Sequence, residues 1–132
     1  MIRYGTKEDL NQIEAFDIFG GKREQEILSK RLKVYILDNK VVGYISIIEN
    51  SCLFGHPLIS FLCVHPQYRS QGIASALLLD IEQKYIDCKL FISTESNNSI
   101  MLNLVKKRGY TLSGSLSGLN EDGSDEVYFY KT

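Results

Sequence analysis

The feature that most constrains the fold of this chain is a strand that leads through a short polar loop into a helix. Leu58–Val64 is almost entirely apolar, which predicts a strand covered on both faces. Apolar residues then recur every three to four positions over residues 72–85, which is the spacing of one buried helix face. A strand joined in this way to a helix indicates an α/β protein.

The remaining segments extend this pattern along the whole chain. Strands are predicted at residues 2–4, 34–37, 41–48, 89–93, 110–115 and 125–131, and helices at residues 7–17, 22–30 and 96–108. In the helix of residues 96–108, the spacing predicts that Ile100, Met101, Leu104 and Val105 face inward. Helices between the strands of one mixed sheet predict an α/β sandwich. With 132 residues the chain is long enough for one core and too short for two ordinary ones, so we expect a single domain over residues 1–132.

Charge and composition exclude several classes of function. The formal net charge is −1, so the chain lacks the basic excess of a typical nucleic-acid-binding protein. No apolar run approaches the ~20 residues that cross a bilayer, and residues 1–9 lack the apolar core of a signal peptide, so we expect a cytoplasmic protein without a membrane partner. The three cysteines form no CxxC pair and only two histidines accompany them, so no metal site is predicted.

The loop that opens the helix of residues 72–85 is suited to bind an anion. A helix N-terminus carries unpaired N–H groups and a partial positive charge, which attract phosphate. Gly72 lets the backbone approach an anion closely, Arg69 and Gln71 add donors, and Ala74 is small enough for close packing. An ordinary strand-to-helix turn would explain the same residues equally well. The loop is neither a P-loop nor a dinucleotide fingerprint.

Two segments resemble motifs of the GCN5-related N-acetyltransferase (GNAT) family. Residues 64–74, VHPQYRSQGIA, resemble that family's VxPxxRgxGiG/A segment. Residues 98–110, from Asn98 to Gly109-Tyr110, resemble its NxxAxxLYxxxGF segment. The element order is also similar over nearly the whole chain. The resemblance implies a mixed, mostly antiparallel sheet of six to seven strands with about four helices, splayed between its fourth and fifth strands.

The same resemblance implies acetyl-CoA as cosubstrate and a set of residues that bind it. Backbone groups of the fourth strand would pair with the pantetheine amides, the helix-opening loop would hold the pyrophosphate, and an asparagine would contact the pantetheine arm. The strand residues are Leu62, Cys63 and Val64, and the asparagine is Asn98. The residues of the loop and helix start are Arg69, Ser70, Gln71, Gly72, Ile73 and Ala74.

The chain departs from the family pattern at its acid and base positions. Val105 stands where the family commonly has a tyrosine that protonates the leaving thiolate. The fourth strand contains no carboxylate, and Ser60, its only polar side chain, is a candidate catalytic residue. Glu95, at the end of the fifth strand, is therefore the first candidate for the general base. The acidic loop of residues 120–126 supplies the second candidate for the general base. Within it, Glu126 and Asp122 are favoured, because the loop partly resembles the same region of other GNAT members.

The implied activity is direct transfer of an acetyl group to the primary amine of a small molecule, an amino acid or a protein. The loop of residues 120–126 favours a cationic acceptor. A non-catalytic acyl-CoA-binding sensor is the alternative, because the usual acid and base are missing. Four aromatic residues could line an acceptor pocket or belong to the core; they are Tyr4, Phe16, Phe19 and Tyr44. The sequence leaves the acceptor and the choice between monomer and homodimer open.

Overall fold

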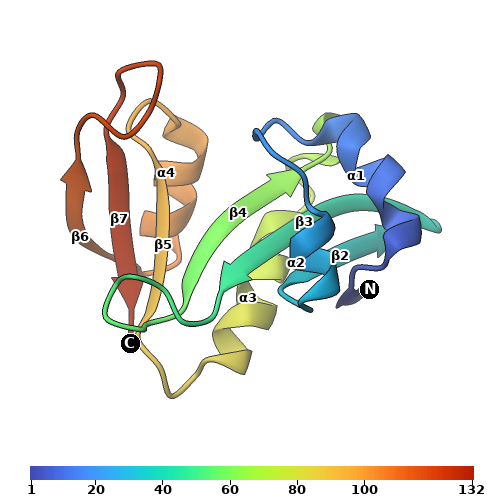
Figure 1. The fold of residues 1–132 in the computed structure, drawn as a ribbon, viewed down its shortest axis with the longest axis horizontal. Coiled ribbons are helices and arrows are strands. Elements are labelled where there is room, and N and C mark those ends of the chain that lie inside the picture. Colours follow the sequence, from blue (N-terminus) through green and yellow to red (C-terminus); the bar gives the residue numbers. More distant parts are fainter.

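Seven strands form one sheet in the order β1-β2-β3-β4-β5-β7-β6 (Figure 1). The computed structural model describes residues 1–132. The strands are β1 (Ile2–Tyr4), β2 (Leu32–Leu37), β3 (Lys40–Ile48), β4 (Leu58–Val64), β5 (Leu90–Glu95), β6 (Thr111–Leu116) and β7 (Glu126–Lys131). All neighbouring strands are antiparallel except β4 and β5, which are parallel. The expected mixed, mostly antiparallel sheet is therefore confirmed.

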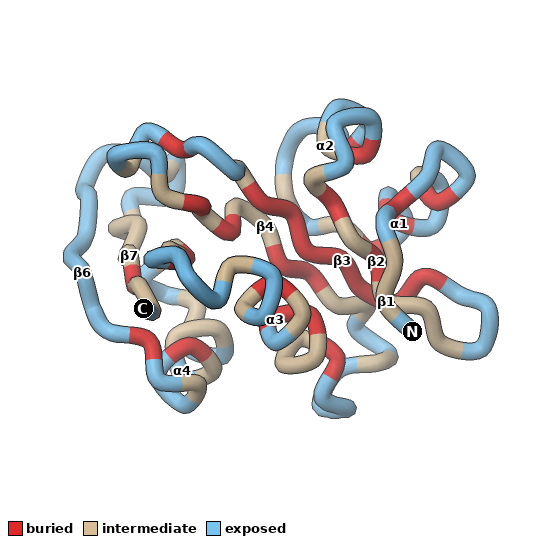
Figure 2. Tube along the Cα trace, turned by 90° about the horizontal axis from the view of Figure 1, so that it is seen from below, coloured by how far each residue is buried: buried red, intermediate tan, exposed pale blue.

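Four α helices cover the sheet on its two faces. They are α1 (Leu10–Phe16), α2 (Glu24–Leu28), α3 (Ile73–Lys84) and α4 (Ser99–Lys107). Figure 2 shows α1 and α2 on one face and α3 and α4 on the other. A buried apolar cluster lies under each helix pair, so the β1–β4 half of the sheet is covered on both faces. The β5–β7–β6 part has helical cover only from α4 (Figure 1).

The sheet opens between β4 and β5. These strands pair only at Leu58 with Phe91 and at Ile59 with Ile92, and then diverge. A bulge in β4 coincides with this point, because Ser60 has no partner on β3. The expected splay is therefore confirmed. The prediction that this strand is covered on both faces also holds in its second half, because Leu62 and Cys63 belong to the buried clusters on opposite faces of the sheet. The diverging β5 leaves free the edge of β4.

The helices beside the opening begin and end at residues with specific backbone roles. Gly72 precedes α3 with φ 78°, a left-handed conformation that favours glycine. The Oδ1 atom of Asn98 caps α4 by accepting the N–H of Met101 at 3.1 Å. Ile100, in the first turn of α4, was expected to face inward from its helical spacing. It is instead 75% exposed, because it borders the open cavity rather than the core.

Candidate active site

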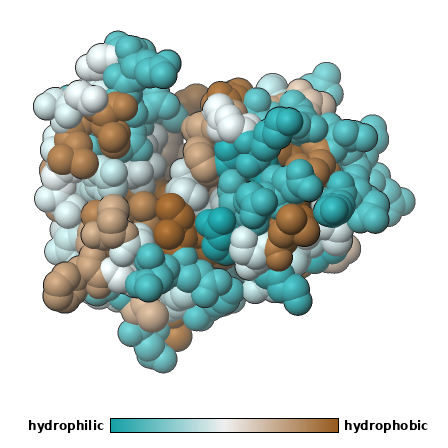
Figure 3. Space-filling model, viewed as in Figure 1, coloured by the Kyte–Doolittle hydropathy of each residue, from teal (hydrophilic) through white to brown (hydrophobic).

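A cavity of about 730 Å³ lies at the opening between β4 and β5. Residues from both faces of the sheet line it. We call the part lined by residues 68–75 and α4 the helix end. The part lined by Ile18, Phe19, Glu95, Leu119 and Glu126 is called the loop end. In Figure 3 a notch separates the β6–β7 side of the surface from the α1 side, with hydrophobic residues on both borders.

The helix end presents a row of free backbone donors. None of the N–H groups from Arg69 to Ser75 donates to a protein acceptor. Ser70 and Gly72 both have positive φ, 64° and 78°, and turn this segment toward the cavity. A Cβ atom on Gly72 would meet no heavy atom within 4 Å, so the protein leaves space here. Together with the α3 N-terminus, the segment has the free donors and the partial positive charge that suit an anion.

The predicted phosphate-binding residues lie together at this end. All of them line the cavity except Gln71, which is exposed beside it. The Arg69 guanidinium donates through Nε to the carbonyl of Val64 at 3.4 Å, which ties the loop to the end of β4. Lys107, at the C-terminus of α4, is the second cationic residue of the cavity wall.

The free edge of β4 presents alternate backbone groups to the opening. His65 donates its N–H to the carbonyl of Val42 on β3 at 2.8 Å. Because successive residues of a strand direct their backbone groups to opposite sides, Val64 and Leu62 direct theirs toward the opening. Cys63 then directs its backbone groups to β3. Its thiol is buried near Phe16, and burial raises the pKa of this thiol, which argues against a nucleophilic thiolate.

Two predicted residues of α4 differ in their environments. Asn98 uses Oδ1 to cap the helix, while its Nδ2 donates to no protein acceptor and the residue lines the cavity. Its capping role is therefore compatible with a ligand contact through Nδ2. Val105 is fully buried against the sheet and does not line the cavity. No other group of α4 replaces the missing tyrosine hydroxyl there, because the α4 residues on the cavity wall are Ile100, Met101, Asn103, Leu104 and Lys107.

The candidate bases come together at the loop end. Glu95 on β5 and Glu126 on β7 lie directly opposite each other, and both line the cavity. Asn120 donates from Nδ2 to Glu126 at 3.1 Å. Ser60 also lines the cavity and donates its hydroxyl to the carbonyl of Ser46 at 3.2 Å.

Asp122, the remaining candidate base, does not line the cavity. Its carboxylate accepts from the Ser124 hydroxyl and backbone N–H and from Asn97, and these bonds lower its pKa. A carboxylate engaged in shaping the β6–β7 loop is poorly placed to take a proton from a molecule in the cavity.

Tyr128 is a cavity residue that sequence reasoning missed. It lies opposite Ser93 on β5, and its side chain lines the cavity. Burial, followed by the charge of Glu126, raises the pKa of this phenol, so it stays protonated and able to donate. The signal was present in the sequence, because residues two apart on a strand share a face and Glu126 was already a candidate.

Only one of the four predicted aromatic candidates lines the cavity. That residue is Phe19. Phe16 and Tyr44 are core residues, and the Tyr44 hydroxyl donates to Asp17 at 2.7 Å. Tyr4 lies away from the cavity, beside the ammonium groups of Lys33 and Lys84.

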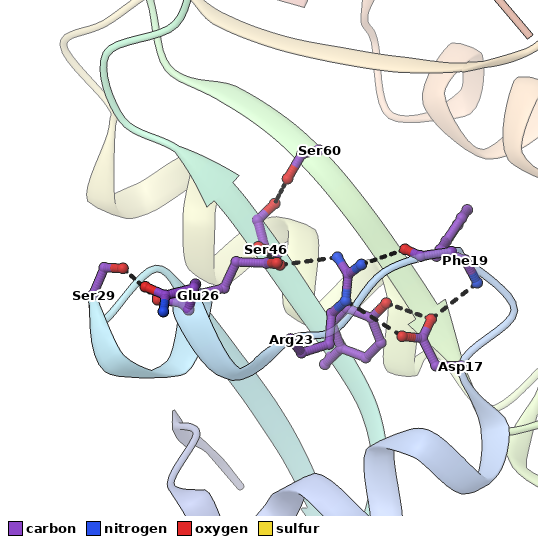
Figure 4. Close-up of polar contacts among 10 residues, drawn as sticks. Asp17, Phe19, Arg23, Glu26, Ser29, Ser46 and Ser60 are labelled. Atoms are coloured by element: carbon purple, nitrogen blue, oxygen red, sulfur yellow. Dashed lines mark hydrogen bonds and ion pairs between the residues drawn. The ribbon is translucent and has the colours of Figure 1, made fainter.

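A buried ionic cluster supports the loop that carries Phe19 (Figure 4). Arg23, with a side chain only 3% exposed, donates to the carbonyl of Gly20 at 2.7 Å and to Glu26 at 3.0 Å. Its Nε lies 3.4 Å from Oδ2 of Asp17. The guanidinium carbon is 4.0 Å from the ring centroid of Phe61. The Phe61 ring also packs against the Phe19 ring, with the centroids 5.0 Å apart. This cluster joins segments distant in sequence, which is why no local pattern revealed it.

No helix is both long and apolar enough to cross a membrane. No group of three or more histidine, cysteine, aspartate or glutamate residues is arranged to hold a metal ion.

Comparison with known proteins gives one family match and many similar structures. The model of the "Acetyltransferase (GNAT) family" matches residues 5–110. A GNAT family acetyltransferase from Bacillus cereus ATCC 10987 is 27% identical, with 100% of this chain and 96% of that chain covered and a TM-score of 0.84.

Two more distant structures have the same fold. For a ribosomal-protein-alanine N-acetyltransferase from Brucella melitensis the identity is 21%, the coverage 99% and 98%, and the TM-score 0.79. For Arabidopsis thaliana Naa50, in complex with the bisubstrate analogue CoA-Ac-MVNAL, the identity is 20%, the coverage 100% and 97%, and the TM-score 0.80.

Proposed function

Because the chain belongs to the GNAT family of acetyltransferases, we propose that its cavity joins acetyl-CoA at the helix end to a primary amine at the loop end. The activity is acetyl-CoA-dependent N-acetyl transfer, carried by residues 1–132 as one domain. The observation that carries the proposal is the run of free N–H groups from Arg69 to Ser75 beside the β4–β5 opening. An acyl-CoA would use both features, because its pyrophosphate suits the free N–H groups and its pantetheine amides suit the free strand edge.

Acetyl-CoA binding is assigned to backbone groups more than to side chains. The N–H groups of residues 69–75 would hold the pyrophosphate, with Arg69 adding a cation. Backbone groups of Leu62 and Val64 would pair with the pantetheine amides, as an added strand does. The free Nδ2 of Asn98 would donate to the same arm.

The reaction is a direct displacement on the thioester. The amine nitrogen forms a bond to the carbonyl carbon while the carbon–sulfur bond breaks and the sulfur takes the electron pair. Glu95 or Glu126 takes the proton of the amine, directly or through a water held by Ser60. Polarisation of the carbonyl is assigned to the N–H of Val64. No acid is required at neutral pH, because a thiol has a pKa of about 8.5 and its thiolate is an acceptable leaving group.

The acceptor is a primary amine of a small molecule or of a polypeptide. Two of the similar structures support the polypeptide, since one is described as a ribosomal-protein-alanine N-acetyltransferase and the other carries a bisubstrate analogue with the sequence MVNAL.

The test is amine-dependent release of CoA thiol from acetyl-CoA, compared between wild type and Gly72→Glu. A carboxylate at Gly72 repels the phosphates and strains a left-handed backbone, so we expect acetyl-CoA affinity to fall about 100-fold or more. Gly123→Glu is the matched control, because Gly123 also has positive φ (83°) and open space but does not line the cavity. Unchanged release in Gly72→Glu would refute the assignment of the helix end.

One observation favours a second candidate, a non-catalytic acyl-CoA sensor. Val105 is fully buried in place of the usual tyrosine, and β4 carries no carboxylate. A sensor binds acetyl-CoA tightly and releases no thiol with any amine. Its acetyl-CoA affinity is also unchanged in Glu95→Gln and Glu126→Gln, so turnover with an amine is the measurement that decides between the two.

A further inference from the structure

The charged residues of the cavity are divided between its two ends. Its cations are Arg69 and Lys107, both at the helix end, and its carboxylates are Glu95 and Glu126, both at the loop end. Building on the function proposed above, we propose that the acceptor is a primary amine attached beside an apolar group and lacking a carboxylate nearby. Free amino acids are thereby excluded as good acceptors.

The carboxylates of the loop end are short of positive partners. Glu95 and Glu126 face each other across two antiparallel strands, an arrangement in which like charges repel. Neither forms a salt bridge with any Lys or Arg. The amide of Asn120 is the one protein donor, at 3.1 Å from Glu126. A bound ammonium would relieve this repulsion, and a bound carboxylate would increase it.

Arg23, a cation behind the wall of the loop end, cannot serve an acceptor. Arg23 lies against the ring of Phe61 but does not line the cavity, and its side chain is 3% exposed. Its guanidinium is engaged by Asp17, Glu26 and the Gly20 carbonyl. The cluster holds two carboxylates and one guanidinium, which adds one further negative charge behind the wall. Arg23 is therefore not available to pair with a carboxylate of the acceptor.

Part of the uncharged wall of the loop end is apolar. On one side Phe19 and Phe61 pack with their ring centroids 5.0 Å apart and their planes tilted by 46°. Ile18 and Leu119 project from two separate loops and are 68% and 58% exposed. Figure 3 shows hydrophobic residues on both borders of the notch. Exposed aliphatic residues on opposite borders gain burial when an apolar group lies between them.

Two sources supply an amine of this kind. One is the first residue of a polypeptide, whose carbonyl is an amide and carries no charge. The other is a small apolar amine. A free amino acid has the same ammonium and side chain, but its carboxylate lies one carbon away and would face Glu95 and Glu126.

The experiment compares kcat/KM for leucinamide, leucine and glycinamide with wild-type protein and saturating acetyl-CoA. With kcat/KM expressed per unprotonated amine, leucine should be at least about tenfold poorer than leucinamide, because like charges brought together lose more than this factor. Glycinamide should also be about tenfold poorer, because it lacks the side chain that the apolar wall buries. Equal kcat/KM for leucine and leucinamide would overturn the proposal, as would a preference for glycinamide.

A variant pair tests whether the charges cause the discrimination. In Glu126→Gln the ratio of leucinamide to leucine should fall severalfold, whatever the loss in overall rate, since a ratio cancels losses common to both substrates. Glu121→Gln removes a carboxylate of the same loop that does not line the cavity, and should leave the ratio unchanged. A ratio that is the same in Glu126→Gln and wild type would contradict the electrostatic basis.

Further substrates distinguish a polypeptide acceptor from a small amine, and a failure of this inference from a failure of the proposed function. A C-terminally amidated peptide beginning with leucine that exceeds leucinamide identifies a polypeptide acceptor, and 3-methylbutylamine that matches leucinamide identifies a small amine. Either result supports the proposed chemistry. Transfer to leucine equal to that to leucinamide defeats only this inference, whereas no thiol release with any amine defeats the proposed function as well.

Discussion

The two ends of the cavity are built from different kinds of structure. The helix end consists mainly of backbone N–H groups within a single stretch, residues 69–75. The loop end assembles side chains from β4, β5, β7 and the loops after α1 and β6. A site made of backbone from one segment tolerates most side-chain changes, while a site made of distant side chains depends on tertiary packing. The difference predicts that perturbations of one end leave the other largely intact.

The strongest perturbation of the loop end is expected from Arg23→Leu. Removing the guanidinium leaves Asp17 and Glu26 buried without a partner, which should lower the free energy of unfolding by about 3 kcal/mol or more. Denaturant unfolding measures this loss. The folded fraction of Arg23→Leu should bind acetyl-CoA as the wild type does. It should transfer the acetyl group to leucinamide poorly, because the loop with Phe19 loses its support.

Arg31→Leu provides the control for this variant. Arg31 is only partly buried and forms no salt bridge, so we expect a change within about 0.5 kcal/mol. If Arg23→Leu is no less stable than Arg31→Leu, the buried cluster does not support the loop end in the way described.

A smaller effect is expected at the helix end, where Asn98 has two roles. Asn98→Ala removes the cap and should cost about 1 kcal/mol of stability. Asn98→Asp keeps the capping oxygen but loses the Nδ2 donor, so stability should be near wild type while acetyl-CoA affinity falls about fivefold. Thermal unfolding and acetyl-CoA titration of both variants separate the roles. Full acetyl-CoA affinity in Asn98→Asp would show that Asn98 acts only as a cap.

The same division explains what could be predicted from the sequence. The free N–H groups at the helix end could be anticipated from local sequence, because residues 64–74 carry both the glycine with positive φ and the helix start. The splay was implied by the resemblance to the GNAT family. Ile100 was misplaced because helical spacing does not show which residues of a helix border an open cavity. Arg23 and Phe61 were missed because their contact depends on how the segment before α2 packs against β4. Such long-range packing leaves no periodic pattern in a single sequence.

The most direct test of the account is an acetyl-CoA titration of the double variant Glu95→Gln/Glu126→Gln. These substitutions remove both carboxylates of the loop end and leave the N–H groups of residues 69–75 unchanged. We predict a Kd for acetyl-CoA within about twofold of wild type, while thiol release with leucinamide is largely lost. A tenfold weaker Kd, or undiminished transfer to leucinamide, would contradict the claim that one end holds acetyl-CoA and the other receives the amine.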